Sequence, residues 1–187
     1  MFPWILTNYE SEELDLTQPA NFRDLSKPVG ALNSERRNEF IERYNNFDPS
    51  CLITPFHYGT HYSTAAFTLS WLIRLEPYYS AYLALQDGQM EDETRLFTSI
   101  GDSWIGSLMG GQQNVKELTP EFFYLPEMLT GTEAKPLLDN VKLPKWAKSE
   151  QHFIRLHRMA LESDLVSCQL HQWIDLIWGY KSRGLPV

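Results

Sequence analysis

The chain has 187 residues, of which 43% are hydrophobic and 13% aromatic, and it carries a formal net charge of −8 at pH 7. That length suits one domain with a core of its own, and the aromatic content argues against a disordered chain. The acidic charge disfavours nucleic acid as a partner, and no apolar run approaches the ~20 residues that span a bilayer.

Two cysteines, Cys51 and Cys168, stand far apart and not at the spacing of metal ligands. Such sparse cysteines are typical of reduced, cytosolic proteins, so a cytoplasmic location is expected. A single disulfide between them is the alternative.

Residues 2–32 are predicted to be extended and irregular. Phe2 to Leu6 has the apolar run of a buried strand, and later prolines push their neighbours out of helical geometry. The strip 21–28 mixes charged with large apolar side chains. We expect Arg23 to satisfy carboxylate and backbone groups there, because the strip has no ladder of its own.

The first predicted helix begins at a cap formed by Asn33 or Ser34 and runs to about Asn46. Its buried side is expected to carry Phe40, Ile41 and Tyr44.

The nonapeptide 55–63 (PFHYGTHYS) is predicted to be the stretch around which the chain is organised. Pro55 and Gly59 prevent regular structure, while its large rings make it too apolar for a free loop. Ser63 is expected to cap a helix that Pro77 ends. That helix repeats apolar residues at spacings of three and four, which predicts a buried face: Ala65, Ala66, Leu69, Leu72 and Ile73.

Two further helices are predicted before the middle of the chain. The first runs from Tyr78 to about Gln86 and closes at Gly88, a usual left-handed cap. The second is expected over residues 92–109 and ends at a pair of glycines.

Residues 114–128 form a second aromatic strip, in which Pro120 and Pro126 exclude a long helix. Residues 129–142 are interpreted as a surface loop. From Ser149 onward two helices are predicted, one buried through Phe153, Ile154 and His157 and the other ending at Gly179. The predicted fold is mainly α, with an unusual share of ordered but irregular chain.

His57 and His61 stand four residues apart, the spacing of two zinc ligands on one helix face. Gly59 and Pro55 disfavour that helix, and Tyr58 occupies the position where metalloproteases carry glutamate. We interpret both histidines as structural and predict neither a metal nor a catalytic residue. The alternative is a metal-dependent hydrolase that uses both histidines and a glutamate.

Three glutamates in or near the second strip, Glu117, Glu121 and Glu127, suggest paired acids of the kind found in glycosidases. The strip is too apolar for an open sugar cleft. We expect these side chains instead to be anchors that pair with Arg23, Lys27 or Arg74.

Several long motifs together resemble the BEACH domain. They are residues 21–28, the nonapeptide 55–63, VKEL at 115–118 leading to PEFFYLPE at 120–127, and ALES at 160–163 followed by QWIDLIWGYK at 172–181. Residues 6–16 and 167–173 are most similar to the neurobeachin branch of that family.

The resemblance implies helices packed around core segments that lack regular secondary structure, and no enzymatic activity or cofactor. It implies a module of a large cytosolic scaffold in vesicle and membrane trafficking, peripherally and indirectly associated with endomembranes. Such domains usually follow a pleckstrin-homology-like domain and precede WD repeats, which are the expected partners together with trafficking proteins. Members of the neurobeachin branch also anchor protein kinase A, through a part of the protein that lies elsewhere.

The family's domain normally begins upstream of Phe2 and continues past Gly184, so residues 1–187 are expected to be a single partial BEACH domain that is truncated at both ends. The loop 131–140 is shorter than in the family. We expect the aromatic strips and nearby polar groups to shape an interaction groove. Its candidate residues are Arg23, Lys27, His57, Tyr58, His61, Arg74, Glu117 and Glu121.

Overall fold

The computed structural model describes residues 1–57, 65–89, 96–111 and 114–182. Within them the α-helices are α1 (Ser34–Asn45), α2 (Ala65–Leu72), α3 (Tyr78–Leu85), α4 (Ile100–Met109), α5 (Glu150–Leu161), α6 (Asp164–Ser167) and α7 (Leu170–Ile177). Short 3-10 turns are η1 (Pro19–Asn21), η2 (Val29–Ala31), η4 (Pro120–Phe123), η5 (Pro126–Leu129) and η6 (Tyr180–Ser182). The described residues contain isolated β-bridges but no sheet. The prediction of a mainly α fold is confirmed.

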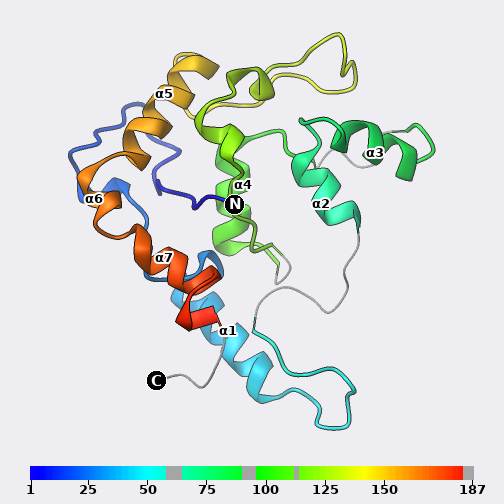
Figure 1. Cartoon of the computed structure of the whole chain (residues 1–187), viewed down its shortest axis with the longest axis vertical. Helices are drawn as coiled ribbons and strands as arrows, with labels where there is room; N and C mark the ends of the chain where they lie inside the picture. Colours follow the sequence, from blue (N-terminus) through cyan, green and yellow to red (C-terminus); the bar gives the residue numbers. More distant parts are fainter. Residues whose placement is uncertain (58–64, 90–95, 112–113, 183–187) are drawn as a thin grey trace.

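The helices surround a centre made of extended chain. Figure 1 shows α5, α6 and α7 along one side, α2 and α3 on the other, and α4 with the N-terminal segment between them. Segments that are far apart in the sequence therefore lie together, because the first residues lie against segments from the middle and the end of the chain.

The N-terminal segment is deeply buried. Trp4, Ile5 and Leu6 have no exposed surface. Phe2 exchanges two backbone hydrogen bonds with Leu118, of 2.8 and 2.9 Å, and the Ile5 carbonyl accepts the N–H of Arg23 at 2.8 Å. The strip 114–128 and the strip 21–28 therefore flank the N-terminal segment as short, irregular substitutes for sheet partners.

Aromatic rings fill the space between these segments. The ring of Trp4 lies 5.5 Å from that of Trp104 and 5.6 Å, edge-on, from that of Tyr9. Trp71 stacks on Phe122 at 5.5 Å. Such offset and edge contacts add about 0.5–1.5 kcal/mol per pair beyond the area they bury. The predicted packing of rings around irregular chain is therefore present among the described residues, and Trp4 takes part in several of its ring contacts.

The nonapeptide 55–63 does not occupy the core where the structure describes it. Pro55 and His57 are exposed and Phe56 is half-buried against Phe47, with ring centroids 5.6 Å apart. Residues 58–63 lie outside the described residues.

Several helix predictions are confirmed. The Asn33 side chain caps α1 by accepting the backbone N–H groups of residues 35 and 36, and α5 begins directly after Ser149, where a helix was predicted. Gly88 follows α3 with a φ of 80°, and its N–H donates to the Leu83 carbonyl at 2.8 Å. Only glycine adopts that φ without steric cost. Local capping chemistry was therefore readable from the sequence.

The helix predicted over residues 92–109 is wrong for residues 96–99, because α4 begins at Ile100 and residues 96–98 are not helical. Residues 92–95 lie outside the described residues. Two carbonyls that a helix would use internally accept hydrogen bonds from distant segments. Arg74 donates to the Phe97 carbonyl at 2.9 Å, and the N–H of Lys142 donates to the Thr98 carbonyl at 2.9 Å. Tertiary hydrogen bonds thus replace helical ones.

Other predictions of burial are also wrong. No residue within α2 is fully buried, and Ile41 and Tyr44 on α1 are exposed. Two members of the same predicted faces, Ile73 and Phe40, are buried as expected. The segment 129–142, predicted as a surface loop, contributes three buried apolar side chains to the core: Leu129, Leu138 and Val141. A periodic pattern identifies an apolar face but not the neighbour that covers it.

Candidate functional site

The candidate groove contains one close ion pair, between Arg23 and Glu117. The guanidinium donates through Nη1 to Oε2 at 2.7 Å and through Nη2 to Oε1 at 2.8 Å. Both residues are buried, with 2% and 8% of their surface exposed. The pairing predicted for Glu117 with one of three cations is therefore confirmed, with Arg23 as the partner.

The Glu117 carboxylate also accepts two further hydrogen bonds. The backbone N–H of Trp4 donates to Oε2 at 3.0 Å, and the indole of Trp173 donates to Oε1 at 3.1 Å. A buried carboxylate needs such compensation, because an unpaired one costs several kcal/mol. One side chain thereby joins the N-terminus, the two strips and α7.

The remaining bonds of Arg23 hold its own strip in place. Its guanidinium donates to the Lys27 carbonyl at 3.1 Å and, more weakly, to the Trp4 carbonyl at 3.4 Å. Lys27 itself points outward and pairs with Asp24 at 2.9 Å, both side chains being about half exposed. The buried guanidinium therefore supports an exposed charged turn.

The other candidate residues are not gathered around this pair. Glu121 is half-buried and accepts from the Tyr124 hydroxyl at 3.4 Å, and Glu127 is exposed. Neither makes an ion pair with Arg23, Lys27 or Arg74 within the described residues, so the pairing predicted for them is wrong. The groove as a binding surface stays a prediction.

Arg74 is buried at a different place, on the segment that follows α2. Its Nε donates to the Phe97 carbonyl at 2.9 Å and its Nη1 to the Asp139 carbonyl at 2.6 Å. Burial lowers the pKa of its guanidinium to about 10, which still leaves it charged at neutral pH.

His57 lies at the surface, and its ring stacks on that of Tyr44 at 4.0 Å with an interplanar angle of 5°. Its carbonyl accepts from Arg43 at 2.7 Å. Tyr58 and His61 lie outside the described residues. Within the described ranges no three histidine, cysteine or acidic side chains come together as metal ligands.

A buried pair that the sequence did not reveal joins Tyr9 to His157. The Phe122 carbonyl, which can only accept, lies 3.3 Å from Nδ1 of His157, so Nδ1 carries the proton. Nε2 then accepts from the Tyr9 hydroxyl at 3.1 Å. Burial lowers the pKa of His157 to about 4 and raises that of Tyr9. The apolar stripe of α5 predicted that His157 is buried, but nothing local pointed to Tyr9.

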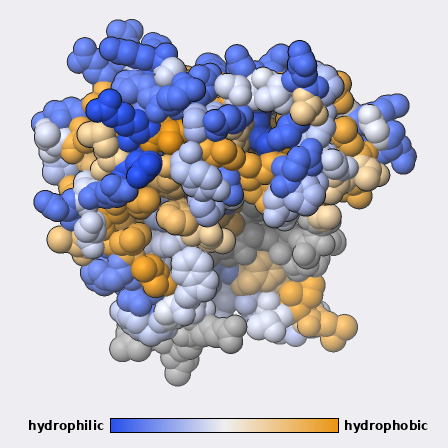
Figure 2. All heavy atoms as spheres, turned by 45° about the horizontal axis from the view of Figure 1, so that its top comes forward, coloured by the Kyte–Doolittle hydropathy of each residue, from blue (hydrophilic) through white to orange (hydrophobic). Residues whose placement is uncertain are grey.

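Apolar side chains also reach the surface. Figure 2 shows hydrophobic atoms in patches between hydrophilic ones on the face it presents. On the last helical turns Ile174, Trp178 and Tyr180 are 43, 59 and 68% exposed, and Trp178 packs edge-on against buried Trp173. Both cysteines are exposed and unpaired. No helix among the described residues is long and apolar enough to cross a bilayer.

The arrangement of buried extended strips inside a ring of helices, with an internal ion pair, agrees with the family that the motifs resemble. Comparison with known families matches the Beige/BEACH domain over residues 1–186. The chain belongs to the BEACH domain family. It is 55% identical over 192 aligned positions to a putative neurobeachin homolog of Caenorhabditis briggsae, and 54% identical to one of Caenorhabditis elegans.

Each of these alignments covers 98% of the chain but 8% of the relative. The BEACH chain therefore corresponds to a small part of those proteins. Its motifs belong to that part, and what the rest of such a protein does is a separate question.

Proposed function

We propose that the chain is a non-catalytic interaction module of a scaffold protein that acts in vesicle and membrane trafficking. Its relatives are named as putative neurobeachin homologs, and the buried polar groups described above are engaged in holding the fold. The observation that carries the proposal is the use of Glu117, the most enclosed acid among the described residues, by four internal donors. A carboxylate so engaged has no free lone pair aimed at a substrate.

The expected partners are an adjacent pleckstrin-homology-like domain, WD repeats of the same parent protein, and trafficking proteins. The location that goes with this function is cytoplasmic, at the periphery of endomembranes. With a charge of −8 the chain has little attraction for anionic lipid, so membrane association would be indirect. Anchoring of protein kinase A, where the parent protein performs it, is assigned to no residue of this chain.

The exposed turn above the buried pair is the surface we favour for docking of the preceding domain. Asp24 and Lys27 present both signs of charge there, and Arg23 fixes their backbone from below. Interfaces between domains are typically polar, with 600–1,500 Å2 buried, which suits a rigid charged rim of this kind.

A charge reversal tests this assignment. The preceding domain of a relative is titrated calorimetrically into the chain and into its Lys27→Glu variant, with Lys145→Glu as the matched control, because Lys145 is 69% exposed. We expect Lys27→Glu to weaken docking about five- to tenfold, and Lys145→Glu to leave it unchanged. Equal affinities for all three proteins would contradict the assignment.

A further inference from the structure

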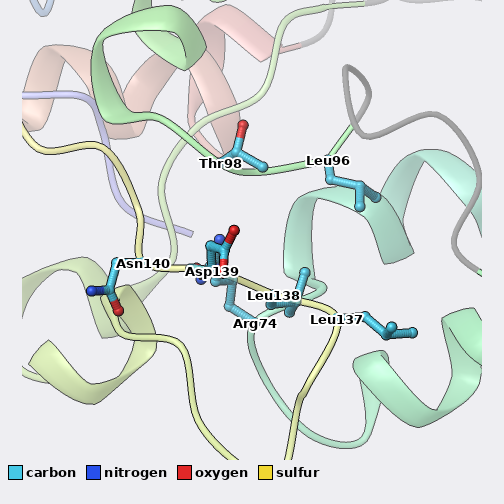
Figure 3. Close-up of a pocket in the computed structure, with 7 residues that line it drawn as sticks. All are labelled: Arg74, Leu96, Thr98, Leu137, Leu138, Asp139 and Asn140. Atoms are coloured by element: carbon cyan, nitrogen blue, oxygen red, sulfur yellow. Dashed lines mark hydrogen bonds between the residues drawn. The ribbon is translucent and has the colours of Figure 1, made fainter.

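A cavity of about 350 Å3 lies between two extended segments, residues 96–98 and 137–140. Neither Arg23 nor Glu117 is among the residues that line it. Figure 3 shows the side chains that line it: Arg74, Leu96, Thr98, Leu137, Leu138, Asp139 and Asn140. Its size is at the lower end of that of pockets for small ligands, which span about 300–1,000 Å3.

Hydrogen bonds fix the two segments that form the walls of the cavity relative to each other. At one end Lys142 bridges to the backbone around Ser99, with hydrogen bonds of 2.9 Å to the Thr98 carbonyl and 3.1 Å from the Ile100 N–H. Beyond that bridge the guanidinium of Arg74 donates to the carbonyl of Phe97 on one wall and of Asp139 on the other. Arg74 thus links the two walls, and the cavity is present before any ligand binds.

Arg74 brings unused hydrogen-bonding capacity to this cavity. The residue is 3% exposed, and a guanidinium has five N–H donors. Of these, the described residues engage one on Nε and one on Nη1, and no carboxylate among them makes a hydrogen bond to the guanidinium. The charge of Asp139 acts on Arg74 from nearby, but it only partly offsets the effect of burial, which lowers the pKa of the arginine to about 10.

The remaining lining is half polar and half apolar. The Oδ1 of Asn140 accepts from the N–H of Gly131 at 2.7 Å, which leaves its amide N–H2 as a donor. The Thr98 hydroxyl is a further polar group, and three leucines supply apolar surface: Leu96, Leu137 and Leu138. Planar carboxylates match the fork of a guanidinium, and the leucines suit a hydrocarbon body.

The charges of the described lining disfavour a dianion more than a monoanion. Arg74 is a cation in this lining, and the exposed Asp139 beside it repels a dianion such as phosphate more strongly than a monoanion. The ammonium of neighbouring Lys135 is engaged with the Arg74 carbonyl. We propose that this cavity binds a carboxylate attached to an apolar body, with Arg74 and Asn140 on the carboxylate and the leucines around the body. The proposal does not rest on the docking function above.

Such a carboxylate has two sources, the C-terminus of a peptide and a free small acid. The full chain is titrated by calorimetry and by amide NMR with N-acetyl-leucine, with a pentapeptide that ends in leucine, and with the C-terminal amide of each; inorganic phosphate is the control anion. We expect each acid to bind at least about tenfold more tightly than its amide, and phosphate to bind more weakly than the acids. Tighter binding of the peptide than of N-acetyl-leucine identifies a chain terminus as the ligand, and the reverse identifies a small acid.

Variants separate the site from general binding. Asp139→Asn removes the competing charge and is expected to tighten acid binding about two- to fivefold. Leu137→Glu adds a charge to a half-exposed wall and is expected to abolish it, whereas Leu85→Glu, at a leucine of the same 50% exposure outside the cavity, is the matched control. Arg74→Lys keeps the charge without the fork and is expected to weaken binding at least about tenfold.

Arg74→Lys is interpreted only if its thermal unfolding remains cooperative, and otherwise the variants at Asp139 and Leu137 decide. Equal binding of acid and amide would overturn the proposal. So would acid binding that neither Asp139→Asn nor Leu137→Glu changes.

Discussion

Arg23 and Glu117 are 94 residues apart in the sequence and form a two-pronged ion pair of 2.7 and 2.8 Å inside the core. Burying two charges is expensive, and their attraction repays the cost only when the remaining donors and acceptors are also satisfied. Here the indole of Trp173 and the N–H of Trp4 complete the carboxylate. The ion pair therefore fixes how four segments of the chain pack against one another.

Removal of one partner of this pair strands the other. We expect Arg23→Ala and Glu117→Ala each to lower the free energy of unfolding by about 3–5 kcal/mol. Lys27→Ala, whose side chain is half exposed, should change it by less than about 0.5 kcal/mol. Urea unfolding measures all three. A double variant that loses as much as the sum of the single losses would show that the two charges are not coupled.

Acidification is expected to destabilise the protein through His157. Its pKa falls from 6.5 to about 4 on folding because burial disfavours the charged ring. The folded protein therefore favours the neutral form of His157. The resulting contribution to the free energy of unfolding is complete above pH 6.5 and declines as the pH falls toward 4. Over that window it amounts to about 3 kcal/mol.

The measurement compares urea unfolding at pH 7 and pH 5 for three proteins. His157→Gln should lose part of the pH dependence, whereas His171→Gln, at an exposed position, should retain it. An unchanged slope in His157→Gln would show that other groups cause the acid sensitivity.

Self-association of the isolated chain is expected to depend on its last helical turns. Trp178 and Tyr180 expose 59 and 68% of their surface, and exposed apolar clusters favour association. The double substitution Trp178→Ser and Tyr180→Ser should shift sedimentation toward monomer, with little effect on thermal unfolding. A double substitution at exposed Leu52 and Phe67 is the control for lost hydrophobicity elsewhere.

Metal analysis of the purified chain tests the alternative of a hydrolase at His57 and His61. We expect less than one equivalent of zinc, with no difference in His57→Ala, because the ring of His57 is already stacked on Tyr44 at 4.0 Å. One equivalent of zinc that His57→Ala removes would support the hydrolase instead.

Sequence reasoning reached the features that depend on neighbouring residues. The cap at Asn33, the start of α5 after Ser149 and the turn at Gly88 each follow from side chains within a few positions. It also placed Arg23 among the partners of Glu117, because few cations stand within apolar segments.

Features that depend on distant segments escaped it. The extended residues before α4 follow from hydrogen bonds to Arg74 and Lys142, and the partner of His157 lies 148 residues away at Tyr9. Neither contact leaves a periodic trace. The burial of α2 was overestimated for the same reason. An apolar face is expected to pack against another segment, but its pattern does not show which segment that is.

The enclosure of residues 2–6 has a consequence for biosynthesis. These residues leave the ribosome well before the groups that enclose them, because Glu117, which accepts the backbone N–H of Trp4, is translated 113 residues later. At about 5–20 residues per second, this apolar segment waits for several seconds before its partners exist. Residues 2–6 are therefore a natural binding site for chaperones that hold nascent hydrophobic segments.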